Sequence, residues 1–529
     1  MIIKPENLIK LTKRKYSDII ILLAIIILGA GLRFYHLGSN PFVADEFLDM
    51  NSAYGYAQTH VWQAWDFNLS RPNVEDVFAP RDERAWLYKW QVAELLKFFP
   101  PTEATARSVS VVWGIISIFV VYWAARYFSK RKVIGLLSAF LFAVSVTAIA
   151  FDRKLRMYSM FYPLYLLLSL FLYQFFEEDY SGKTRLVKFF YQKFKVNVLY
   201  LLPVLITAFV SWSIQLLTVN IVPVFGTYVF IQALMSARKK DYLNKYSVTL
   251  ALGVVAGIGA YVVVPQTVML YLGSLTFFIN NQEYFVRIMQ DYGNYLLALV
   301  MLCSGVYFLY RQKFTKQALW LTLSVLVPLV MAAFMWKRTQ GIQYVFFLQS
   351  SIIILIASGI YYWARFLTNH MTAFPKRVFW TTMIVALLVL PDYGYFWSGD
   401  TTYHRDTTQV ADYRKALAYV KKNLKLGDLL ITRHFRDYYL SGANANIYDF
   451  GGERAQTDLS LATVQSLVQQ NPHGWVVLFD NDDQFLSNQA LDYIKNNMTA
   501  TDVSAIRGAA KAYRWGNAQP QPTTQPAAQ

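Results

Sequence analysis

The chain has 529 residues, of which 55% are apolar or aromatic and only 16% are charged, and its mean hydropathy is +0.28. Soluble globular proteins carry about 25% charged residues, so this composition excludes an ordinary soluble enzyme, a disordered chain and a fibrous repeat. The net charge of +17 comes from short Lys and Arg clusters between apolar runs, which is typical of a membrane protein and not of a nucleic-acid-binding face. The single cysteine, Cys303, excludes a disulfide framework and a cysteine-based zinc site.

Apolar runs close to the length of a membrane helix recur through most of the chain. Crossing the bilayer takes about 20 apolar residues. The first run is followed directly by Arg33 and Phe34 without a small-residue cleavage site, so we interpret it as a retained span and not as a signal peptide. The pattern predicts an α-helical polytopic membrane protein with about eleven transmembrane helices. The runs lie near 17–32, 108–127, 133–151, 157–176, 197–216, 218–235, 248–270, 293–310, 318–335, 344–363 and 378–393.

Clusters of Lys and Arg precede the first run and then follow every second run. The first cluster includes Lys10 and Lys13, and the last includes Lys376 and Arg377. All clusters fall on one side if about eleven runs span the bilayer, and the positive-inside rule makes that side cytoplasmic. We therefore expect a multi-pass protein of the inner, or cytoplasmic, membrane, with a cytoplasmic N-terminus and an extracytoplasmic C-terminal segment.

Residues 33–107 form an outer loop that is longer than a connection needs, and long loops often carry function. Asp45-Glu46 follows the first span by about a dozen residues. A carboxylate there could act as a general base on a hydroxyl or bind a divalent cation; the structural alternative is a solvated turn or a helix N-cap. Residues 50–65 and 84–99 carry apolar and aromatic side chains at helical spacing, which predicts two helices at the membrane surface.

Two basic clusters fall on the outer side, against the positive-inside trend. Residues 151–158 include Arg153 and Arg156, and residues 336–344 include Lys337 and Arg338. Cations there could bind lipid phosphate or could reach the headgroups as flanking residues commonly do. No Asp or Glu lies near the middle of a predicted span, which disfavours an ion-coupled transporter.

The C-terminal segment from about residue 394 predicts a small α/β domain. Helices are expected at 410–424 and 486–497, and strands at 429–432, 474–479 and within 503–515. We interpret Asp480, Asp482 and Asp483 as a solvated turn rather than a metal site, and none of His404, His434 and His473 as a ligand. The last residues are rich in Pro, Gln, Ala and Thr, which indicates disorder. The predicted domains are a transmembrane domain at 1–393, an extracytoplasmic α/β domain at 394–515 and a disordered tail at 516–529.

Four short stretches are spread along the chain: Asn40 to Glu46, Ala106 to Gly114, Arg153 to Tyr158, and Tyr413 to Ala416 with Leu426 to Asp428. Together they resemble the GT-C class of membrane glycosyltransferases. The branch it resembles most includes the relatives of protein O-mannosyltransferases and of the lipid A aminoarabinose transferase, the glycosyltransferase 39/83-like proteins. The chain departs from this pattern at Ser213 to Gln215, where the family often has His, and at Gln343-Tyr344, where it often has Arg-Tyr. The Trp-Trp-Asp element of oligosaccharyltransferases is absent, which argues against transfer of a whole oligosaccharide to Asn.

The resemblance implies a glycosyltransferase that moves a single sugar from a polyprenyl-phosphate donor to an acceptor hydroxyl on the outer face. The acceptor would be a lipid, a glycan or a protein, and nucleic acid would have no part. Asp45 would be the base and Glu46 would assist it. Inversion at the anomeric carbon is expected. No cofactor is required, although a divalent cation could join Asp45 and Glu46.

The implied donor-phosphate residues are Arg153, Arg156, Lys337 and Arg338. The implied substrate-binding residues are Tyr158, Asp82, Glu83, Arg84, Gln343 and Tyr344. Two other classes stay open from the sequence. One is a lipid or solute transporter, and the other is a membrane-anchored protein that binds cell-wall material.

Overall fold

The computed structural model describes residues 5–73, 83–289, 291–337, 341–368, 374–389, 411–451, 459–501 and 510–516. Contacts divide the chain into two compact units. The first comprises Met1–Leu37 and Arg107–Tyr403, and the second comprises Gly38–Ala106 and His404–Gln529. Most of the outer loop thus shares a unit with the C-terminal segment. The predicted boundary at 393/394 and nearly all of the predicted tail lie outside the described residues.

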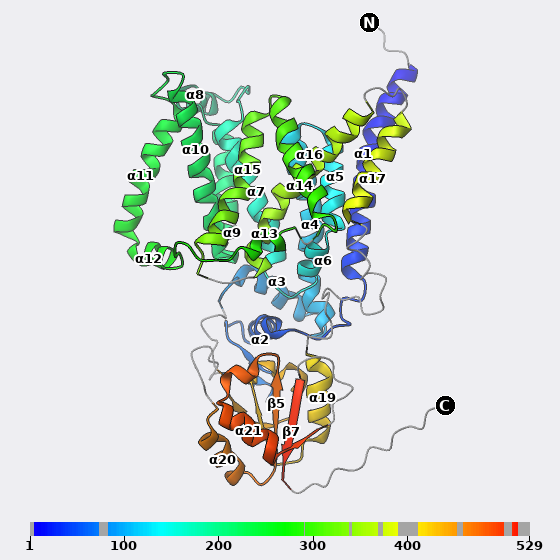
Figure 1. Cartoon of the computed structure of the whole chain (residues 1–529), viewed down its shortest axis with the longest axis vertical. Helices are drawn as coiled ribbons and strands as arrows, with labels where there is room; N and C mark the ends of the chain where they lie inside the picture. The colour runs from blue at the N-terminus through cyan, green and yellow to red at the C-terminus, as the bar shows by residue number, and fades with distance from the viewer. Residues whose placement is uncertain are drawn as a thin grey trace. The chain divides into compact units, whose positions relative to one another are not determined.

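Unit 1 is built from helices, many of which run side by side (Figure 1). Its sequence is dominated by long apolar stretches, whose backbone groups find hydrogen-bond partners inside a helix even where no water is present. The helices are α1 (Pro5–Phe34), α4 (Glu103–Ser129, which begins in unit 2), α5 (Lys132–Ala143), α6 (Val146–Asp152), α7 (Tyr158–Glu177), α8 (Arg185–Phe194), α9 (Leu201–Ile214), α10 (Ile221–Ala237), α11 (Lys245–Val263), α12 (Pro265–Gly273), α13 (Glu283–Arg287), α14 (Tyr295–Arg311), α15 (Thr315–Phe334), α16 (Gln349–Leu367) and α17 (Phe374–Val389).

In the described part of the chain, six helical stretches are long and apolar enough to cross a membrane, or up to eight if each of two bent pairs is one span. The chain is therefore a multi-pass membrane protein. Fewer helices than the predicted eleven or so are long and apolar enough to count as spans among the described residues. One reason is that α14 and α17 are shorter than 18 residues, although both are helical where a span was predicted.

Several predicted spans are interrupted. The run at 133–151 is broken between α5 and α6, which meet at 61°. Ser145 caps α6 by accepting from the Ala148 amide, and Asp291 accepts from the Ser145 hydroxyl and from the Thr147 amide (2.5 and 2.7 Å). The run at 248–270 is broken at Pro265, which has no amide hydrogen to continue a helix. Hydropathy alone does not detect such breaks, because the residues at them are apolar or small.

Unit 2 contains α2 (Ala44–Thr59), the short strands β1 (Trp65–Asp66) and β2 (Arg71–Pro72), and α3 (Trp86–Leu96), all from the outer loop. Both predicted loop helices exist, but α2 begins at Ala44 and ends before His60, which adopts a left-handed conformation (φ 60°). Trp65, expected on that helix, lies in β1 instead. The apolar face of α2 is buried, including Met50 and Ala53.

The C-terminal part of unit 2 has a five-stranded sheet in the order β4-β3-β5-β7-β6, with β3 parallel to β4 and β5, and β7 antiparallel to β5 and β6. Strands β3 and β5 and the helices α19 and α21 lie where the sequence predicts them, whereas β4 and α20 were not predicted. The core packs Ile431, Val476 and Leu478 against α20 and α21. The elements are α19 (Tyr413–Asn423), β3 (Leu429–Thr432), the 3-10 turn η7 (His434–Leu440), β4 (Asn446–Asp449), α20 (Leu461–Gln470), β5 (Gly474–Phe479), η8 (Asp482–Phe485), α21 (Asn488–Asn497), β6 (Thr499–Ala500) and β7 (Ala510–Trp515).

Candidate functional site

The acidic pair lies in the first turn of α2. The Glu46 side chain is fully buried, and one of its oxygens accepts a hydrogen bond from the Val43 amide (3.0 Å). This contact is the reciprocal half of a capping box and fixes the start of the helix. Asp45 is exposed on the surface of the unit. Of the two carboxylates, only Asp45 is therefore exposed, while Glu46 holds the turn that carries it.

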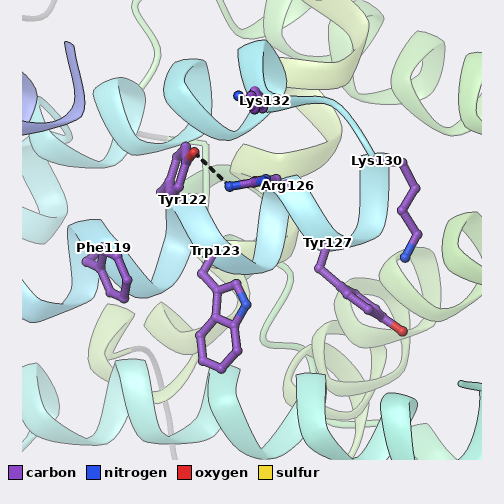
Figure 2. Close-up of a pocket in the computed structure, with 7 residues that line it drawn as sticks. All are labelled: Phe119, Tyr122, Trp123, Arg126, Tyr127, Lys130 and Lys132. Carbon is purple, nitrogen blue, oxygen red and sulfur yellow. Dashed lines mark hydrogen bonds between the residues drawn. The ribbon is translucent and has the colours of Figure 1, made fainter. Parts of the chain in front are cut away.

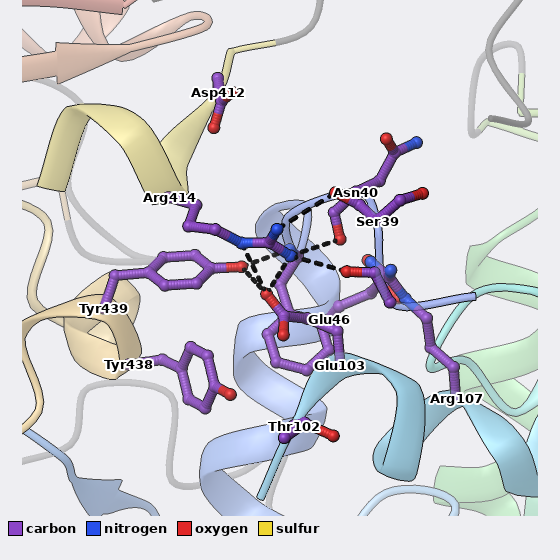
Figure 3. A network of polar contacts seen from close by, with 12 residues as sticks. Ser39, Asn40, Glu46, Thr102, Glu103, Arg107, Asp412, Arg414, Tyr438 and Tyr439 are labelled. Carbon is purple, nitrogen blue, oxygen red and sulfur yellow. Dashed lines mark hydrogen bonds and ion pairs between the residues drawn. The ribbon is translucent and has the colours of Figure 1, made fainter. Parts of the chain in front are cut away.

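The segment before the pair is held by one arginine (Figure 3). Arg414, at the start of α19, donates to the backbone oxygens of Gly38, Ser39 and Asn40 at 2.9–3.2 Å. The same guanidinium pairs with one oxygen of Glu103 at 2.6 Å. That oxygen also accepts from the Tyr439 hydroxyl (2.7 Å).

Tyr439 completes the connection, because its hydroxyl oxygen accepts from the Phe42 amide (2.8 Å). The ring of Tyr439 lies edge-on to Phe47, one residue after Glu46, at 5.7 Å. Residues 38–47 are therefore fixed from both sides of the acidic pair. Sequence reasoning identified Arg414 only as part of a family-like stretch, and it missed Glu103 and Tyr439.

Replacing Arg414 with Ala should lower any activity that depends on Asp45 by roughly 10²-fold, since small displacements of a catalytic group cost about that much. The Lys variant should recover part of this loss, because it keeps the positive charge but lacks the several N–H donors of the guanidinium. The measurement is the catalytic rate of purified protein, together with its melting temperature. Lys415→Ala is the matched control on the same helix, as the Lys415–Asp412 pair is long (3.9 Å) and Lys415 is exposed. Wild-type rates in Arg414→Ala would contradict a positioning role.

Unit 1 carries a buried ion pair beside the second family-like stretch. Arg33 at the end of α1 donates to Asp152 at 2.7 Å, and the two side chains are 0% and 1% exposed. Arg33 also donates to the backbone oxygen of Ala143 (2.9 Å). Gly114 of α4 allows this close approach, since a Cβ there would lie 2.4 Å from an Asp152 oxygen. The pair therefore joins α1, α5 and α6, and α4 packs against it.

Two further arginines, Arg107 and Arg153, donate to backbone oxygens at the end of α1 and in the residues that follow it. Arg107 is fully buried and donates to the Leu37 oxygen (3.2 Å), and Arg153 donates to the oxygens of Leu32 and His36 (both 3.2 Å). Arg156 is also largely buried, and its guanidinium lies 5.8 Å from the ring centre of Tyr158. The predicted phosphate residues Arg153 and Arg156 thus share one turn between α6 and α7, where Arg153 also orders the backbone.

The other predicted site residues are distributed over both units. In unit 1, Lys337 is exposed, while Gln343 and Tyr344 are half-buried in the 3-10 turn η4 (Ile342–Tyr344). In unit 2, Glu83 is exposed and Arg84 is half-buried. Arg338 and Asp82 lie outside the described residues. The roles predicted for all of them remain predictions.

The solvated-turn interpretation of the C-terminal segment was wrong for Asp482. Asp482 does not lie in a solvated turn: it is 1% exposed and forms two contacts with Arg436, at 2.5 and 2.9 Å. His434 was not predicted to be a ligand, and that prediction remains untested; it lies with Asp66 and Asp437 in a group whose donor atoms are all within 4.8 Å of one another. Such a carboxylate–histidine group is chemically able to hold a metal ion.

A pocket of about 690 Å³ lies at the C-terminal end of α4 (Figure 2). Arg107 lies near the other end of α4, about 18 Å from Phe119, its nearest lining residue on that helix, at 1.5 Å per residue, so this pocket is separate from the arginines described above. One of its cations, Lys132, pairs with Asp18 (2.6 Å). The lining residues are Phe119, Tyr122, Trp123, Arg126, Tyr127, Lys130 and Lys132.

Comparisons with known proteins found similarity in structure but none in sequence. No protein-family model matches the chain, and no curated protein matches it in sequence. The oligosaccharyltransferase AglB from Archaeoglobus fulgidus, solved with an inhibitory peptide and a dolichol-phosphate, matches with a TM-score of 0.59 at 9% identity, over 88% of this chain and 69% of that chain. ArnT from Cupriavidus metallidurans in the apo state matches with a TM-score of 0.57 at 11% identity, over 96% of this chain and 98% of that chain.

The chain has the GT-C glycosyltransferase fold. The resemblance inferred from the short stretches is thereby confirmed. ArnT bound to undecaprenyl phosphate also matches, with a TM-score of 0.53 at 11% identity, over 95% of this chain and 98% of that chain. The match to ArnT covers nearly the full length of both chains, so the GT-C fold accounts for both the helical part and the C-terminal segment.

Proposed function

We propose that this protein is a glycosyltransferase that moves a single sugar from a polyprenyl-phosphate donor to an acceptor hydroxyl on the outer face of the membrane. The observation that carries the proposal is the GT-C fold together with an exposed Asp45 whose helix start is fixed by Glu46 and Arg414. Structures with this fold have been solved with dolichol-phosphate and with undecaprenyl phosphate. A lipid phosphate is thus the natural donor class for this chain.

In the proposed reaction, the Asp45 carboxylate takes the proton of the acceptor hydroxyl as its oxygen attacks the anomeric carbon. A new carbon–oxygen bond forms while the bond from that carbon to the phosphate oxygen breaks. The electron pair leaves with the polyprenyl phosphate, and the attack from the opposite side inverts the anomeric centre. General-base assistance of this kind contributes about 10²–10⁴-fold to the rate.

Negative charge grows on the departing phosphate, so fixed cations lower the barrier. We assign this role to Arg156 and Arg153, with Lys337 and Arg338 as a second group. We place Arg156 first, because the Arg153 guanidinium donates to the backbone oxygens of Leu32 and His36. Tyr158, Glu83, Arg84, Asp82, Gln343 and Tyr344 are proposed to contact the sugar or the acceptor.

The proposed topology follows the positive-inside rule. The N-terminus lies in the cytoplasm, and the acidic pair and the C-terminal segment lie outside the inner membrane. We propose transfer of one sugar rather than an oligosaccharide because the Trp-Trp-Asp element is absent from the sequence. The proposed displacement uses no metal ion, although Asp45 could bind a divalent cation.

The test is donor turnover by the purified full-length protein in detergent. The donors are a panel of polyprenyl-phosphate monosaccharides, with and without a lipid extract that supplies acceptors. We expect one donor to yield free polyprenyl phosphate in an acceptor-dependent way. A protein that is folded and monodisperse but releases no polyprenyl phosphate from any donor, with acceptor extracts of the producing cell present, would contradict the proposal.

Replacing Arg156 with Ala should weaken donor use by about 10–100-fold, since a hydrogen bond to a charged group contributes about 1.5–3 kcal/mol. The loss should appear in kcat/KM for the donor, while Arg156→Lys should keep part of the activity because it retains the charge. Steady-state rates at varied donor concentration give the answer. Arg287→Ala is the control, since its exposed pair with Glu283 lies within one short helix. An unchanged kcat/KM in Arg156→Ala would remove Arg156 from the donor site.

A further inference from the structure

Three side chains of types that can ligate a metal ion lie together in unit 2, away from the acidic pair in the sequence. Asp66 comes from β1 in the outer loop, and His434 and Asp437 come from the turn η7. The His434 Nε2 atom lies 3.4 Å from an Asp66 oxygen and 3.7 Å from an Asp437 oxygen. Both carboxylates are almost fully buried, with side chains 3% and 1% exposed, and the imidazole is 21% exposed. The group is therefore closed on one side and reachable through His434.

These distances fit a metal ion better than direct hydrogen bonds. A hydrogen bond from nitrogen to oxygen spans about 2.7–3.2 Å, and both His434 contacts are longer. Zinc–ligand bonds of about 2.0–2.2 Å in tetrahedral geometry separate neighbouring ligand atoms by roughly 3.3–3.6 Å. The observed separations of 3.4 and 3.7 Å lie close to this range.

The carboxylates are held in place by a surrounding shell of donors, as metal ligands usually are. The Phe67 amide donates to the Asp437 oxygen that faces His434 (2.7 Å), and the Leu69 amide donates to Asp66 (2.8 Å). The Asn51 amide nitrogen donates to the other Asp437 oxygen (3.3 Å). The Asn51 side-chain oxygen, on the same amide group, is buried without a hydrogen-bond partner. A buried acceptor without a hydrogen-bond partner thus lies at the edge of the Asp66–His434–Asp437 group.

The group also places two carboxylates, those of Asp66 and Asp437, beside a single imidazole. Asp449 adds a further carboxylate, which accepts from the His434 backbone amide (2.8 Å). A divalent ion would supply twice the positive charge of the imidazolium.

We propose that Asp66, His434 and Asp437 bind one divalent transition-metal ion, with zinc as the preferred class, and that this ion fastens the outer loop to the turn η7. Mixed imidazole and carboxylate ligands suit zinc and its neighbours in the transition series. The ion would be separate from any cation at Asp45 and would take no part in the displacement. The proposal does not depend on sugar transfer.

The test uses the full-length protein in detergent, freed of metal by a chelator and then titrated with Zn²⁺ against a competing indicator. Wild type should take up one ion per chain, and its melting temperature should rise with Zn²⁺. His434→Gln and Asp66→Asn should each weaken binding by about 100-fold or more, because each removes a ligand. Co²⁺ in place of Zn²⁺ should give the intense visible absorption of a tetrahedral site, and this absorption should be missing in both variants.

The matched control is His473→Gln. His473 also contacts a buried carboxylate, that of Asp428, but no third ligand was found beside them among the described residues. This variant and Asp45→Asn should both keep full zinc binding. Wild type that takes up no zinc at micromolar concentration would overturn the proposal. Stoichiometric binding that survives both His434→Gln and Asp66→Asn, or that is lost in Asp45→Asn, would also overturn it.

Discussion

Asp45→Asn should lower sugar transfer by about 10²–10⁴-fold, the usual contribution of a general base, while leaving the melting temperature near that of wild type. The amide has the size of the carboxylate but does not accept the proton of the acceptor hydroxyl. Because the Asp45 side chain is exposed and the helix start is fixed by Glu46 instead, the substitution should not disturb the fold. Release of polyprenyl phosphate from the active donor measures the effect.

The control for this variant is Asp49→Asn, which removes a carboxylate one turn further along the same helix. It should retain transfer within a few-fold of wild type. If Asp45→Asn turns over donor as fast as wild type, Asp45 is not the base. Glu83 and Asp82 would then be the next carboxylates to replace, as both belong to the same outer loop.

Asp152→Ala should destabilise the protein by about 3–5 kcal/mol, because it leaves the buried Arg33 charge without its partner. Neither side chain of this pair meets solvent, so water has no access to compensate. Asp152→Asn should cost less, since the amide oxygen can still accept from the guanidinium. The measurement is the melting temperature of the detergent-solubilised protein, read from its loss of monodispersity on heating.

An exposed ion pair in the same unit provides the control. Asp18 and Lys132 lie 2.6 Å apart, but their side chains are 25% and 47% exposed. Pairs of this kind contribute about 0–1 kcal/mol, so Asp18→Ala should melt close to wild type. Equal melting temperatures for Asp152→Ala and Asp18→Ala would show that the buried pair has no special importance for stability.

The sequence predicted what depends on local pattern. Apolar runs of near-span length turned out helical, and the strands at 429–432 and 474–479 were placed to the residue. Both are short, strongly apolar segments bounded by turn residues, which is the clearest strand signal. The strand β4 was missed because its four residues, NIYD, are exposed or half-buried and show no apolar run. The break at Pro265 was missed because apolar residues continue on both sides of it.

The site could be predicted only in part, since much of it depends on contacts between distant residues. Asp45 and Glu46 were proposed from their position after the first span, and their catalytic roles stay predictions. Asp437 accepts from an amide 370 residues away, and Asp482 pairs with an arginine 46 residues away. The sequence of an acidic turn does not show whether its carboxylates contact water or a buried arginine. The Asp66–His434–Asp437 group was therefore beyond sequence reasoning.

The central claim is transfer of one sugar from a lipid phosphate to a hydroxyl, and mass spectrometry of both products tests it most directly. With the active donor and its acceptor, the acceptor should gain the mass of one sugar residue for each polyprenyl phosphate that appears. Asp45→Asn should produce neither. An acceptor that gains several sugars in one step, or donor that disappears without a heavier acceptor, would contradict the account.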